Sequence, residues 1–381
     1  MRVGSGNQGR VLLAVDGNSL VHRSFHAQAH TGLKTADGRP MWAVRGLLAQ
    51  LVAAVERIGP DVVVVGFDDA QVSSRRNRWP QYKAARSDKL PTLVEQLELA
   101  ATVLQELGVA VVVPAGLEAD DVLASVAHLA PTIGATTVVM TSDRDAFALI
   151  DDHTRVLRII NGGVEASPLL TCERLMMMLG IRPDQYRDYS ALRGDPSDNL
   201  PGVRGIGPKT AARLLAELGT ARAAFDDLAG DGARVRAAIG AGAARHLAHP
   251  DARPAWELNC QVMHMHADVP LDLHHTAPGC LPLSAPAVRA SFEAHQLTTM
   301  VNQALRVLAG HDAPAPTPHT PWPPMQREAV ARRWPAVESS AVAPDGRARS
   351  WTRPRGVGPR TGKAGGRTPA VAGVHQPSLF D

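Results

Sequence analysis

Four short runs of hydrophobic residues in the first half of the chain have the pattern of buried strands. They cover residues 11–15, 62–65, 109–113 and 136–140. Each run is apolar throughout and does not alternate with polar positions. Continuous apolar runs of this length are typical of parallel strands that are covered on both faces. The pattern therefore predicts four parallel strands.

Longer amphipathic stretches lie between these runs and after them. Apolar positions recur at helical spacing over residues 41–58, 90–107 and 119–130. Strands that alternate with helices predict an α/β fold whose crossover connections are right-handed. Beyond about residue 170 the strand pattern fades, and helical stretches punctuated by glycine and proline follow. We therefore expect a sheet domain over residues 10–185 and a helical domain over residues 186–305.

Composition separates the last part of the chain from the rest. Residues 311–381 contain 12 of the 29 prolines, and they carry 10 Lys and Arg against five Asp and Glu. The remaining chain has 30 basic and 32 acidic residues, so the formal charge of +3 hides a slightly acidic body. A tail of this composition has too little apolar surface to offset chain entropy, and we expect it to be disordered. Any surface for nucleic acid must then be a local patch.

Cysteine content and hydropathy indicate the compartment. Cys172, Cys260 and Cys280 are scattered and lack CxxC spacing, which indicates a reducing cytosol without a disulfide or zinc framework. The first apolar run is interrupted by Asp16, and it is too short for a signal peptide or a membrane span. We expect a soluble, cytoplasmic protein that does not bind a membrane.

Acidic residues follow every predicted strand. In chain order they are Asp16, then Asp68 and Asp69, then Glu118, Asp120 and Asp121, then Asp143 and Asp145. Ligand sites of open parallel sheets form outside the carboxyl ends of the strands, so these acids should converge at one edge. The alternative is that each aspartate only caps the helix that follows it. Acids after all four strands favour a shared site.

A convergent cluster of carboxylates needs positive charge. Two carboxylates ~4 Å apart repel by about 4 kcal/mol at an effective dielectric of about 20, so the cluster must hold a cation or take up protons. Oxygen ligands favour Mg²⁺ or Mn²⁺ over zinc. His22 and His26 have the spacing of a zinc pair but lack the accompanying HExxH glutamate, and we expect packing or substrate-side roles for them. The acids predict a two-metal site for phosphodiester cleavage, with Asp195 and Asp198 as additions.

The sequence GVRGIGPKTA at 202–211 predicts a tight glycine turn that enters a helix. It lacks the Gly-Lys-Ser/Thr adjacency of a P-loop, because Pro208 separates Gly207 from Lys209. Exposed backbone N–H groups at such a turn can hold phosphate without reading bases. The residues that we expect to contact DNA here are Gly202, Gly205, Gly207, Lys209 and Thr210.

The longer stretch GDPSDNLPGVRGIGPKTA resembles the 5′–3′ exonuclease, or flap endonuclease, family, found at the N-terminus of bacterial DNA polymerase I and as stand-alone proteins. The resemblance covers residues 10–305 and includes AVDGNSLVHRSFHA (14–27), VVGFDDA (64–70), GLEADDVLA (116–124) and TSDRDAFALI (141–150). It implies a PIN-like nuclease core followed by a helix-hairpin-helix domain of the helix-three-turn-helix type. The implied activity is metal-dependent cleavage of DNA, as a flap or nicked duplex, and of RNA primers, in replication and repair.

The resemblance also implies roles for individual residues. It gives two Mg²⁺ or Mn²⁺ ions a ligand set of Asp16, Asp68, Glu118, Asp120, Asp121, Asp143, Asp145, Asp195 and Asp198. Residues 73–91 resemble the family's arch, through which a single strand passes; the alternative is a solvated basic loop. Within the arch, Lys83 and Arg75 are implied to neutralise the scissile phosphate. Tyr82 is implied to stack on a base, and Arg86 to bind DNA.

Two further expectations come from resemblance. The hairpin of this family holds K⁺ through backbone carbonyls, for which Gly202, Val203, Gly205 and Ile206 are the candidates. The final residues, HQPSLFD, resemble the bacterial sliding-clamp-binding pentapeptide at 376–380, with Gln376, Leu379 and Phe380 as the contacts.

Chain length and the competing functions complete the predictions. The chain ends too soon for an attached polymerase, so we expect a stand-alone, monomeric nuclease. Two alternatives stay open. One is a ribonuclease of the related PIN-like sheet, which explains the acids but not the hairpin. The other is a structure-specific DNA-binding scaffold that does not cut.

Overall fold

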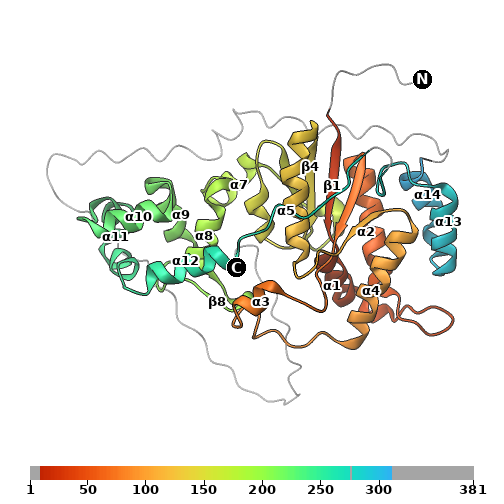
Figure 1. The fold of residues 1–381 in the computed structure, drawn as a ribbon, viewed down its shortest axis with the longest axis horizontal. Helices are drawn as coiled ribbons and strands as arrows, with labels where there is room; N and C mark the ends of the chain where they lie inside the picture. The colour runs from red at the N-terminus through yellow and green to blue at the C-terminus, as the bar shows by residue number, and fades with distance from the viewer. Residues whose placement is uncertain (1–8, 275–276, 311–381) are drawn as a thin grey trace, which may run out of the picture. The chain divides into compact units, whose positions relative to one another are not determined.

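The structure is a computed structural model that describes residues 9–274 and 277–310. The tail at 311–381, with the predicted clamp-binding residues, lies outside these ranges. Figure 1 shows a sheet flanked by helices and a group of helices that follows it in sequence. No helix within the described ranges has the length and hydropathy needed to cross a membrane.

The sheet has six strands in the order β3-β2-β1-β4-β5-β6. Their bounds are β1 Val11–Asp16, β2 Val62–Gly66, β3 Ala110–Val112, β4 Thr136–Thr141, β5 Thr154–Arg158 and β6 Leu169–Leu170. The first five are parallel, and β6 is antiparallel to β5. The four strands predicted from apolar runs are confirmed. The sequence did not predict β5, whose residues Arg155 and Arg158 break the apolar run, or the two-residue β6.

The strand order reverses beside β1, which places a ligand crevice there. From β1 the chain moves outward to β2 and β3 on one side, then returns to β4 on the other side. Asp16 is in register with Gly66 of β2, and Val15 is in register with Met140 of β4. The loops after β1 and β4 therefore diverge and leave open the crevice in which ligands of such sheets bind.

Alternate side chains of each strand build two cores. Leu13 and Val15 of β1 face the helices α1 (Gly17–Gln28), α2 (Trp42–Ile58) and α4 (Pro91–Glu106). Leu12 and Ala14 of the same strand face the helix α5 (Ala119–Leu129). This two-residue alternation is what an extended backbone requires. The helices predicted at 41–58, 90–107 and 119–130 are confirmed.

The helical part after the sheet begins with α7 and continues to α12. The bounds are α7 Cys172–Leu179, α8 Tyr186–Arg193, α9 Pro208–Leu218, α10 Ala221–Ala229, α11 Ala233–Leu247 and α12 Ala252–Val262. Between α8 and α9, the short strands β7 (Gly194–Asp195) and β8 (Leu200–Pro201) pair antiparallel. This two-stranded turn leads into the predicted glycine hairpin. Gly240 interrupts α11 with non-helical backbone angles.

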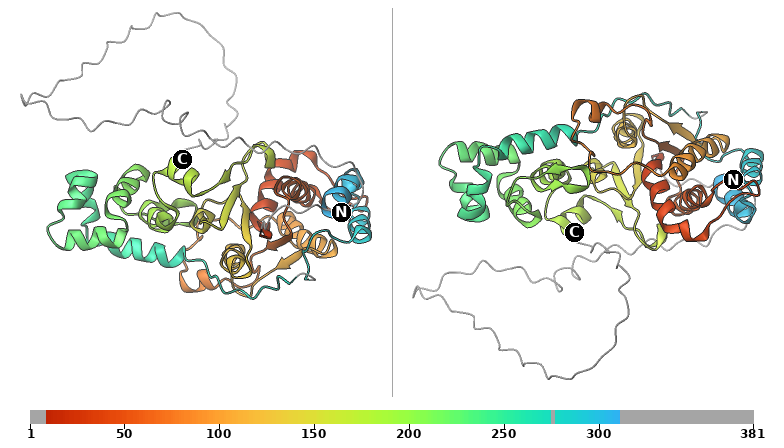
Figure 2. Two further views of the ribbon diagram at one scale, coloured as in Figure 1. Left: turned by 90° about the horizontal axis from the view of Figure 1, so that it is seen from above. Right: turned by 90° about the horizontal axis from the view of Figure 1, so that it is seen from below.

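The last two helices pack against the helices of the sheet domain. In both views of Figure 2, the blue helices α13 (Ala285–Ala294) and α14 (Val301–Leu308) lie beside the red and orange helices. They contact α2 and α4, and they belong to the same apolar core as β1. His295 Nε2 is 2.8 Å from Glu106 Oε2 of α4. These two helices thus pack on the sheet domain although they lie within the range predicted for the helical domain, because amphipathicity reveals an apolar face but not the surface that it covers.

Two shorter helices complete the sheet domain. The helix α3 (Ser74–Arg78) opens the predicted arch, and α6 (Gly163–Ala166) lies between β5 and β6. Ser73 caps α3 by accepting a hydrogen bond from the backbone nitrogen of Arg76. Residues 79–86 continue as turns and not as helix. The arch is thus anchored by one short helix directly after β2 and its aspartates.

Candidate active site

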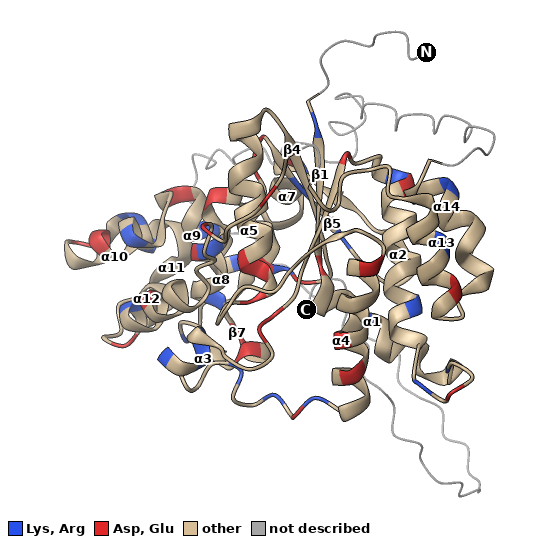
Figure 3. Ribbon diagram, turned by 45° about the vertical axis from the view of Figure 1, so that its right-hand side comes forward, with Lys and Arg blue, Asp and Glu red and all other residues tan. Residues whose placement is uncertain are grey.

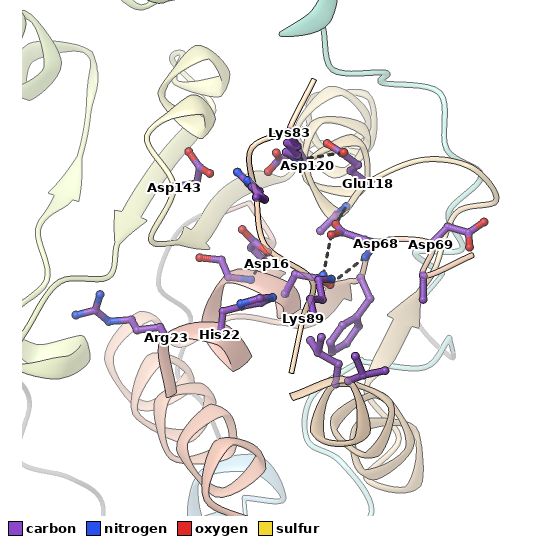
Figure 4. Close-up of a pocket in the computed structure, with 18 of the residues that line it drawn as sticks. Asp16, His22, Arg23, Asp68, Asp69, Lys83, Lys89, Glu118, Asp120 and Asp143 are labelled. Carbon is purple, nitrogen blue, oxygen red and sulfur yellow. Dashed lines mark hydrogen bonds and ion pairs between the residues drawn. The ribbon is translucent and has the colours of Figure 1, made fainter. Parts of the chain in front are cut away.

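A cavity of about 1050 Å³ opens at the carboxyl ends of the central strands (Figure 4). Five of the nine predicted metal-ligand carboxylates line it: Asp16, Asp68, Glu118, Asp120 and Asp143. They lie at the carboxyl end of β1 and in the segments that follow β2, β3 and β4, at the shared edge that the sequence predicted. The structure therefore brings together one acid or more from each of the four strands.

Asp16 and Asp68 are held in place by hydrogen bonds from neighbouring segments. Asp16 accepts from the backbone nitrogen of Ser19 at 2.9 Å, which caps α1, and from the hydroxyl of Thr141 at 2.7 Å. Asp68 accepts from the side-chain amide of Asn18 at 2.7 Å and from the backbone of the first residue of α5 at 3.0 Å. Asp16 thus caps a helix and also faces the cavity, so the two interpretations of these acids are compatible.

Burial and mutual repulsion alter the ionisation of the cluster. Burial is the main reason that the pKa of Asp16 rises to about 7, and the charges of Asp68 and Asp143 add to the rise. Burial also raises the pKa of Asp120 well above its ordinary value, with Asp16 and Asp143 contributing. The pKa of Asp145 rises to about 8, first through burial and then through Asp143. At neutral pH, full ionisation of these carboxyl groups therefore requires added positive charge.

Basic side chains of the arch contact two of the predicted metal-ligand acids, Glu118 and Asp198. Lys83 Nζ is 3.1 Å from Glu118 Oε1 at the cavity, and Arg86 forms an ion pair with Asp198. Burial opposes the charged form of Lys83, but the carboxylates of Glu118 and Asp198 outweigh it and raise the Lys83 pKa. Figure 3 shows Lys and Arg, in blue, along α3 and the loop from α3 to α4. The basic segment is therefore folded against the acids, unlike a freely solvated loop.

Two of the predicted site residues, Arg75 and Asp121, are paired with each other. Arg75 is only 6% exposed, and its two terminal nitrogens donate to the two oxygens of Asp121 at 2.9 and 2.6 Å. Asp121 is fully buried and also accepts from the backbone nitrogens of Glu118 and His266. Both side chains are absent from the cavity lining. The metal-ligand role of Asp121 and the phosphate-neutralising role of Arg75 stay predictions, and each side chain is already paired with the other in this structure.

Tyr82, which is predicted to stack on a base, is buried in this structure. Its ring is 5% exposed and packs with Leu200 and Val262. Its hydroxyl donates to Glu118 Oε2 at 3.2 Å. Lys83 Nζ lies over the ring, 4.6 Å from its centroid. The ring is part of the contact between the arch and the helical part, and its stacking on a base stays a prediction.

The remaining three predicted ligands lie outside the cavity lining. Asp195 accepts from the backbone nitrogen of Ser197 at 2.8 Å and caps the turn that carries Asp198. The charges of Asp195 and Asp198 contribute to the raised pKa of Asp145, so the three carboxyl groups form a second, adjacent group. Their assignment as metal ligands stays a prediction.

The donor chemistry fits a hard divalent cation. The five predicted metal ligands that line the cavity are all carboxylates, a type of ligand that Mg²⁺ and Mn²⁺ prefer. Within the described part of the chain, no three His, Cys, Asp or Glu side chains converge closely enough to hold an ion as they stand. One oxygen of Glu118 and one of Asp198 instead contact Lys83 and Arg86. The carboxylates would hold an ion after these side chains move away.

The sequence did not single out the basic side of the cavity. Arg23, Lys89 and Asn161 line it, and Arg23 donates to Asn161 Oδ1 at 2.7 Å. His22 lines it too, and burial followed by the charge of Lys89 lowers its pKa to about 4, so the imidazole is neutral at pH 7. His26, one turn later on α1, also faces this cavity. The helical spacing of His22 and His26, which places both on one face of α1, was the signal in the sequence for this side of the cavity.

The hairpin glycines differ in what the backbone demands of them. Gly205 has φ +76°, and a Cβ there would lie 2.6 Å from the ring of His246. A Cβ on Gly202 would lie 2.1 Å from the carbonyl oxygen of Arg193. Gly207 has an ordinary φ of −90° and open space around it. Glycine is thus sterically required at 202 and 205, whereas a phosphate contact at 207 stays a prediction.

Comparison with known proteins identifies the family. A model described as the 5′-3′ exonuclease N-terminal resolvase-like domain matches residues 11–176. A second, the 5′-3′ exonuclease C-terminal SAM fold, matches residues 181–282. Together they cover most of the chain. It belongs to the 5′-3′ exonuclease family. The second match ends before α13.

Curated relatives of this family member are DNA polymerases. DNA polymerase I of Mycobacterium tuberculosis is 39% identical over 217 residues, which are 57% of this chain and 24% of that protein. The thermostable DNA polymerase I of Thermus aquaticus is 39% identical over 266 residues, 70% of this chain and 30% of that one. That of Thermus thermophilus is 35% identical over 350 residues, 89% of this chain and 39% of that one. The chain thus spans about a quarter to two fifths of these relatives.

Solved structures share the fold at low sequence identity. The T5 5′-exonuclease, solved with divalent zinc ions bound, has a TM-score of 0.55 at 17% identity, covering 78% of this chain and all of that one. The catalytic core of Rad2 in complex with DNA substrate has a TM-score of 0.53 at 14% identity, covering 80% of this chain and 92% of that one. Both likenesses show the fold.

Proposed function

We propose that the protein hydrolyses phosphodiester bonds of DNA, as a 5′-3′ exonuclease and 5′-flap endonuclease. The observation that carries this proposal is the cavity in which acids from four strands face cations of the arch. Family membership supports it, and so does the structural likeness to T5 5′-exonuclease and to the Rad2 core solved with DNA substrate. Flapped or nicked DNA, with RNA-primed strands, is the proposed substrate.

The proposed cofactor is a pair of Mg²⁺ or Mn²⁺ ions. The first group of carboxylates lines the cavity, namely Asp16, Asp68, Glu118, Asp120 and Asp143, and the second group comprises Asp145, Asp195 and Asp198. Such ions, when bound, activate a water molecule and stabilise the leaving oxygen. The raised pKa values of Asp16 and Asp145 support a site that is completed by positive charge.

The chain's own side chains would bind and orient the strand. Lys83, at the cavity wall, is placed to neutralise charge that builds on the scissile phosphate. Arg23 and Lys89, on the other side of the cavity, would hold a neighbouring phosphate. The exposed Lys209, in the first turn of α9, and the hairpin backbone would hold the duplex away from the cut.

One cleavage experiment separates the three candidate functions. A 5′-labelled flap, a nicked duplex and a single-stranded RNA are each incubated with Mg²⁺ and, in parallel, with EDTA. Metal-dependent cleavage of the flap that is lost in Asp143→Asn supports the proposal. Binding of the flap without cleavage in Mg²⁺ or Mn²⁺ favours the DNA-binding scaffold, and cleavage of RNA alone favours the PIN-like ribonuclease.

The final residues carry a separate proposal, which rests on sequence because they lie outside the described residues. We propose that Gln376, Leu379 and Phe380 bind a bacterial sliding clamp, which would raise the local concentration of the nuclease at flaps. Deletion of 376–381 should abolish clamp binding in a fluorescence-polarisation assay while cleavage of naked flap DNA is retained. Equal clamp binding by the full and shortened chains would refute the proposal.

Two finer proposals concern the hairpin and the assembly. K⁺ would bind at the carbonyls of Gly202, Val203, Gly205 and Ile206. The Val203 carbonyl already accepts from the backbone nitrogen of Ile206 at 3.0 Å, so three of these oxygens are the stronger candidates. Replacing K⁺ by tetramethylammonium at constant ionic strength should weaken duplex binding if the ion is held there. We also propose a monomer, which light scattering would check.

A further inference from the structure

A buried ion pair connects three segments that are distant in the sequence. Arg75 lies on α3, and Asp121 lies in the first turn of α5. Arg75 Nη2 also donates to the backbone carbonyl of His264 at 2.7 Å, and the backbone nitrogen of His266 donates to Asp121 Oδ1 at 2.8 Å. The pair therefore holds the segment that follows α12 against the arch and against α5.

The same segment has a second attachment to α5. Ser125 lies one turn after Asp121 and accepts a hydrogen bond from the backbone nitrogen of Val269 at 3.0 Å. The hydroxyl of Ser125 donates to the carbonyl of Asp121 at 2.7 Å. The return of the chain from the helical part to the sheet is thus fixed at two successive turns of one helix.

The ion pair also determines how Glu118 is presented. Arg75 Nη1 donates to Glu118 Oε2 at 3.1 Å, and the hydroxyl of Tyr82 donates to the same oxygen at 3.2 Å. The other oxygen, Oε1, contacts Lys83 at the cavity. One oxygen is thus fixed by buried donors, and the other is directed toward the cavity.

We propose that Arg75, held by Asp121, is a positioning residue that fixes Glu118 for metal binding and ties residues 264–266 to α5. Arg75 Nη1 is shared between Asp121 Oδ2 and Glu118 Oε2, so the guanidinium sets the distance between the two carboxylates. A guanidinium suits this task because its planar fork donates several hydrogen bonds in fixed directions. Its role toward the metal rests on the proposed function, whereas its role as a tether does not.

The competing role for Arg75 is that of a cation which acts on the substrate by its charge. The two roles predict different results for Arg75→Lys, which retains the charge but loses the fork. A charge effect leaves the affinity for Mn²⁺ unchanged in this variant. A positioning role weakens Mn²⁺ binding about tenfold or more, the usual loss when a residue that orients a metal ligand is altered.

The experiment measures Mn²⁺ binding by electron paramagnetic resonance and, in the metal-free protein, hydrogen exchange of the His266 amide. We expect weaker Mn²⁺ binding and faster exchange in both Arg75→Lys and Asp121→Asn. The matched control is Arg78→Lys, since Arg78 lies on the same helix, is exposed and stacks on Trp79. It should leave both measurements unchanged. Wild-type Mn²⁺ affinity in Arg75→Lys overturns positioning, and wild-type exchange overturns the tether.

Folding failure is addressed by a variant that removes both charges. Arg75→Met combined with Asp121→Leu leaves no unpaired buried ion, and such replacements are commonly tolerated. Its circular dichroism should match the wild type while Mn²⁺ affinity falls about tenfold or more. Wild-type affinity in this double variant overturns the proposal. Absence of Mn²⁺ binding in the wild type itself would reject the proposed metal site and the positioning role, and the exchange measurement would still decide on the tether.

Discussion

Lys83 lies with its ammonium 3.1 Å from Glu118 Oε1 and its backbone nitrogen 2.9 Å from the carbonyl oxygen of Asp198. One residue of the arch therefore contacts the edge of the sheet and the start of the hairpin. Its φ of +56° is in the left-handed region, which a residue other than glycine rarely adopts. Strain of this kind persists where several contacts hold the backbone, as they do here.

Replacing Lys83 by alanine should slow the chemical step more than it weakens DNA binding. Loss of a cation that stabilises charge in the transition state typically lowers the rate by about 10²–10³. Single-turnover cleavage and fluorescence-polarisation affinity would separate the two effects. Lys83→Arg, which keeps the charge, should recover part of the rate. A loss confined to affinity would make Lys83 a simple phosphate contact.

Replacing Asp143 by asparagine should remove cleavage while DNA binding is retained. Its carboxylate lines the cavity, and a bound divalent ion supplies several kcal/mol of transition-state stabilisation, or about a 10³-fold change in rate. Because one negative charge is lost, binding of DNA phosphate should tighten slightly. Near-normal turnover in the variant would contradict the metal assignment. The isosteric change should leave the melting temperature of the protein without metal unchanged or higher.

Tyr82→Phe should weaken Mn²⁺ binding modestly without changing how DNA is bound. The change deletes the hydroxyl that donates to Glu118 Oε2 and leaves the packing against Leu200 and Val262 intact. Since Arg75 still donates to the same oxygen, the loss should be smaller than that in Arg75→Lys. Titration of Mn²⁺ and of flap DNA would measure both. A large loss of DNA affinity would instead show that the hydroxyl itself takes part in DNA binding.

Stability of the metal-free protein should fall as pH rises through the pKa of Asp145, about 8. Above about pH 4 the unfolded chain has released this proton, whereas the folded chain keeps it until about pH 8. Unfolding therefore releases a proton in this window, and higher pH favours unfolding. Asp145→Asn should flatten the decline of the melting temperature between about pH 5 and pH 8, a window set by these two pKa values. An unchanged slope would show that the group is ionised in the fold.

Asp69 provides a control, because its pKa is shifted in the direction opposite to that of Asp145. Backbone hydrogen bonds, the first of them from Gly116, lower the pKa of its carboxyl group. Its contribution to stability is therefore present above the unfolded pKa of about 4 and is lost only as pH falls through the lower folded value. Asp69→Asn should lower the melting temperature by a similar amount at about pH 5 and pH 8.

Gly205→Ala should weaken duplex binding, whereas Gly207→Ala should leave the hairpin folded. Alanine at 205 costs about 1–2 kcal/mol of left-handed backbone strain, and its Cβ would meet the ring of His246. Position 207 has an ordinary φ and space for the methyl group. Affinity for duplex DNA and for a short single strand would be compared in both variants. Equal losses on the two substrates would indicate unfolding of the helical part.

The sequence by itself determined four of the five parallel strands, the helices between them and the acids at the ends of these strands. A continuous apolar run such as 62–65 must be buried on both faces wherever it lies. Its own residues therefore predict a central strand, without knowledge of its neighbours. The acids after each run determined the edge of the sheet where the site forms, because every parallel strand ends on the same side. The glycine turn before α9 was equally local, since the positive φ of Gly205 belongs to the backbone of the hairpin itself.

Only the tertiary structure decided which acid faces the cavity and which surface each helix covers. Asp120 and Asp121 are neighbours in sequence, yet Asp120 lines the cavity and Asp121 is bound by Arg75, 46 residues away. The helices α13 and α14 pack against α2 and α4, although they are amphipathic like the helices of the helical part. Propensity and periodicity depend on near neighbours, whereas the partner of a charged or apolar face depends on segments that meet only after folding. For this reason the strands and helices could be predicted from the sequence, whereas the partners of their charged and apolar faces could not.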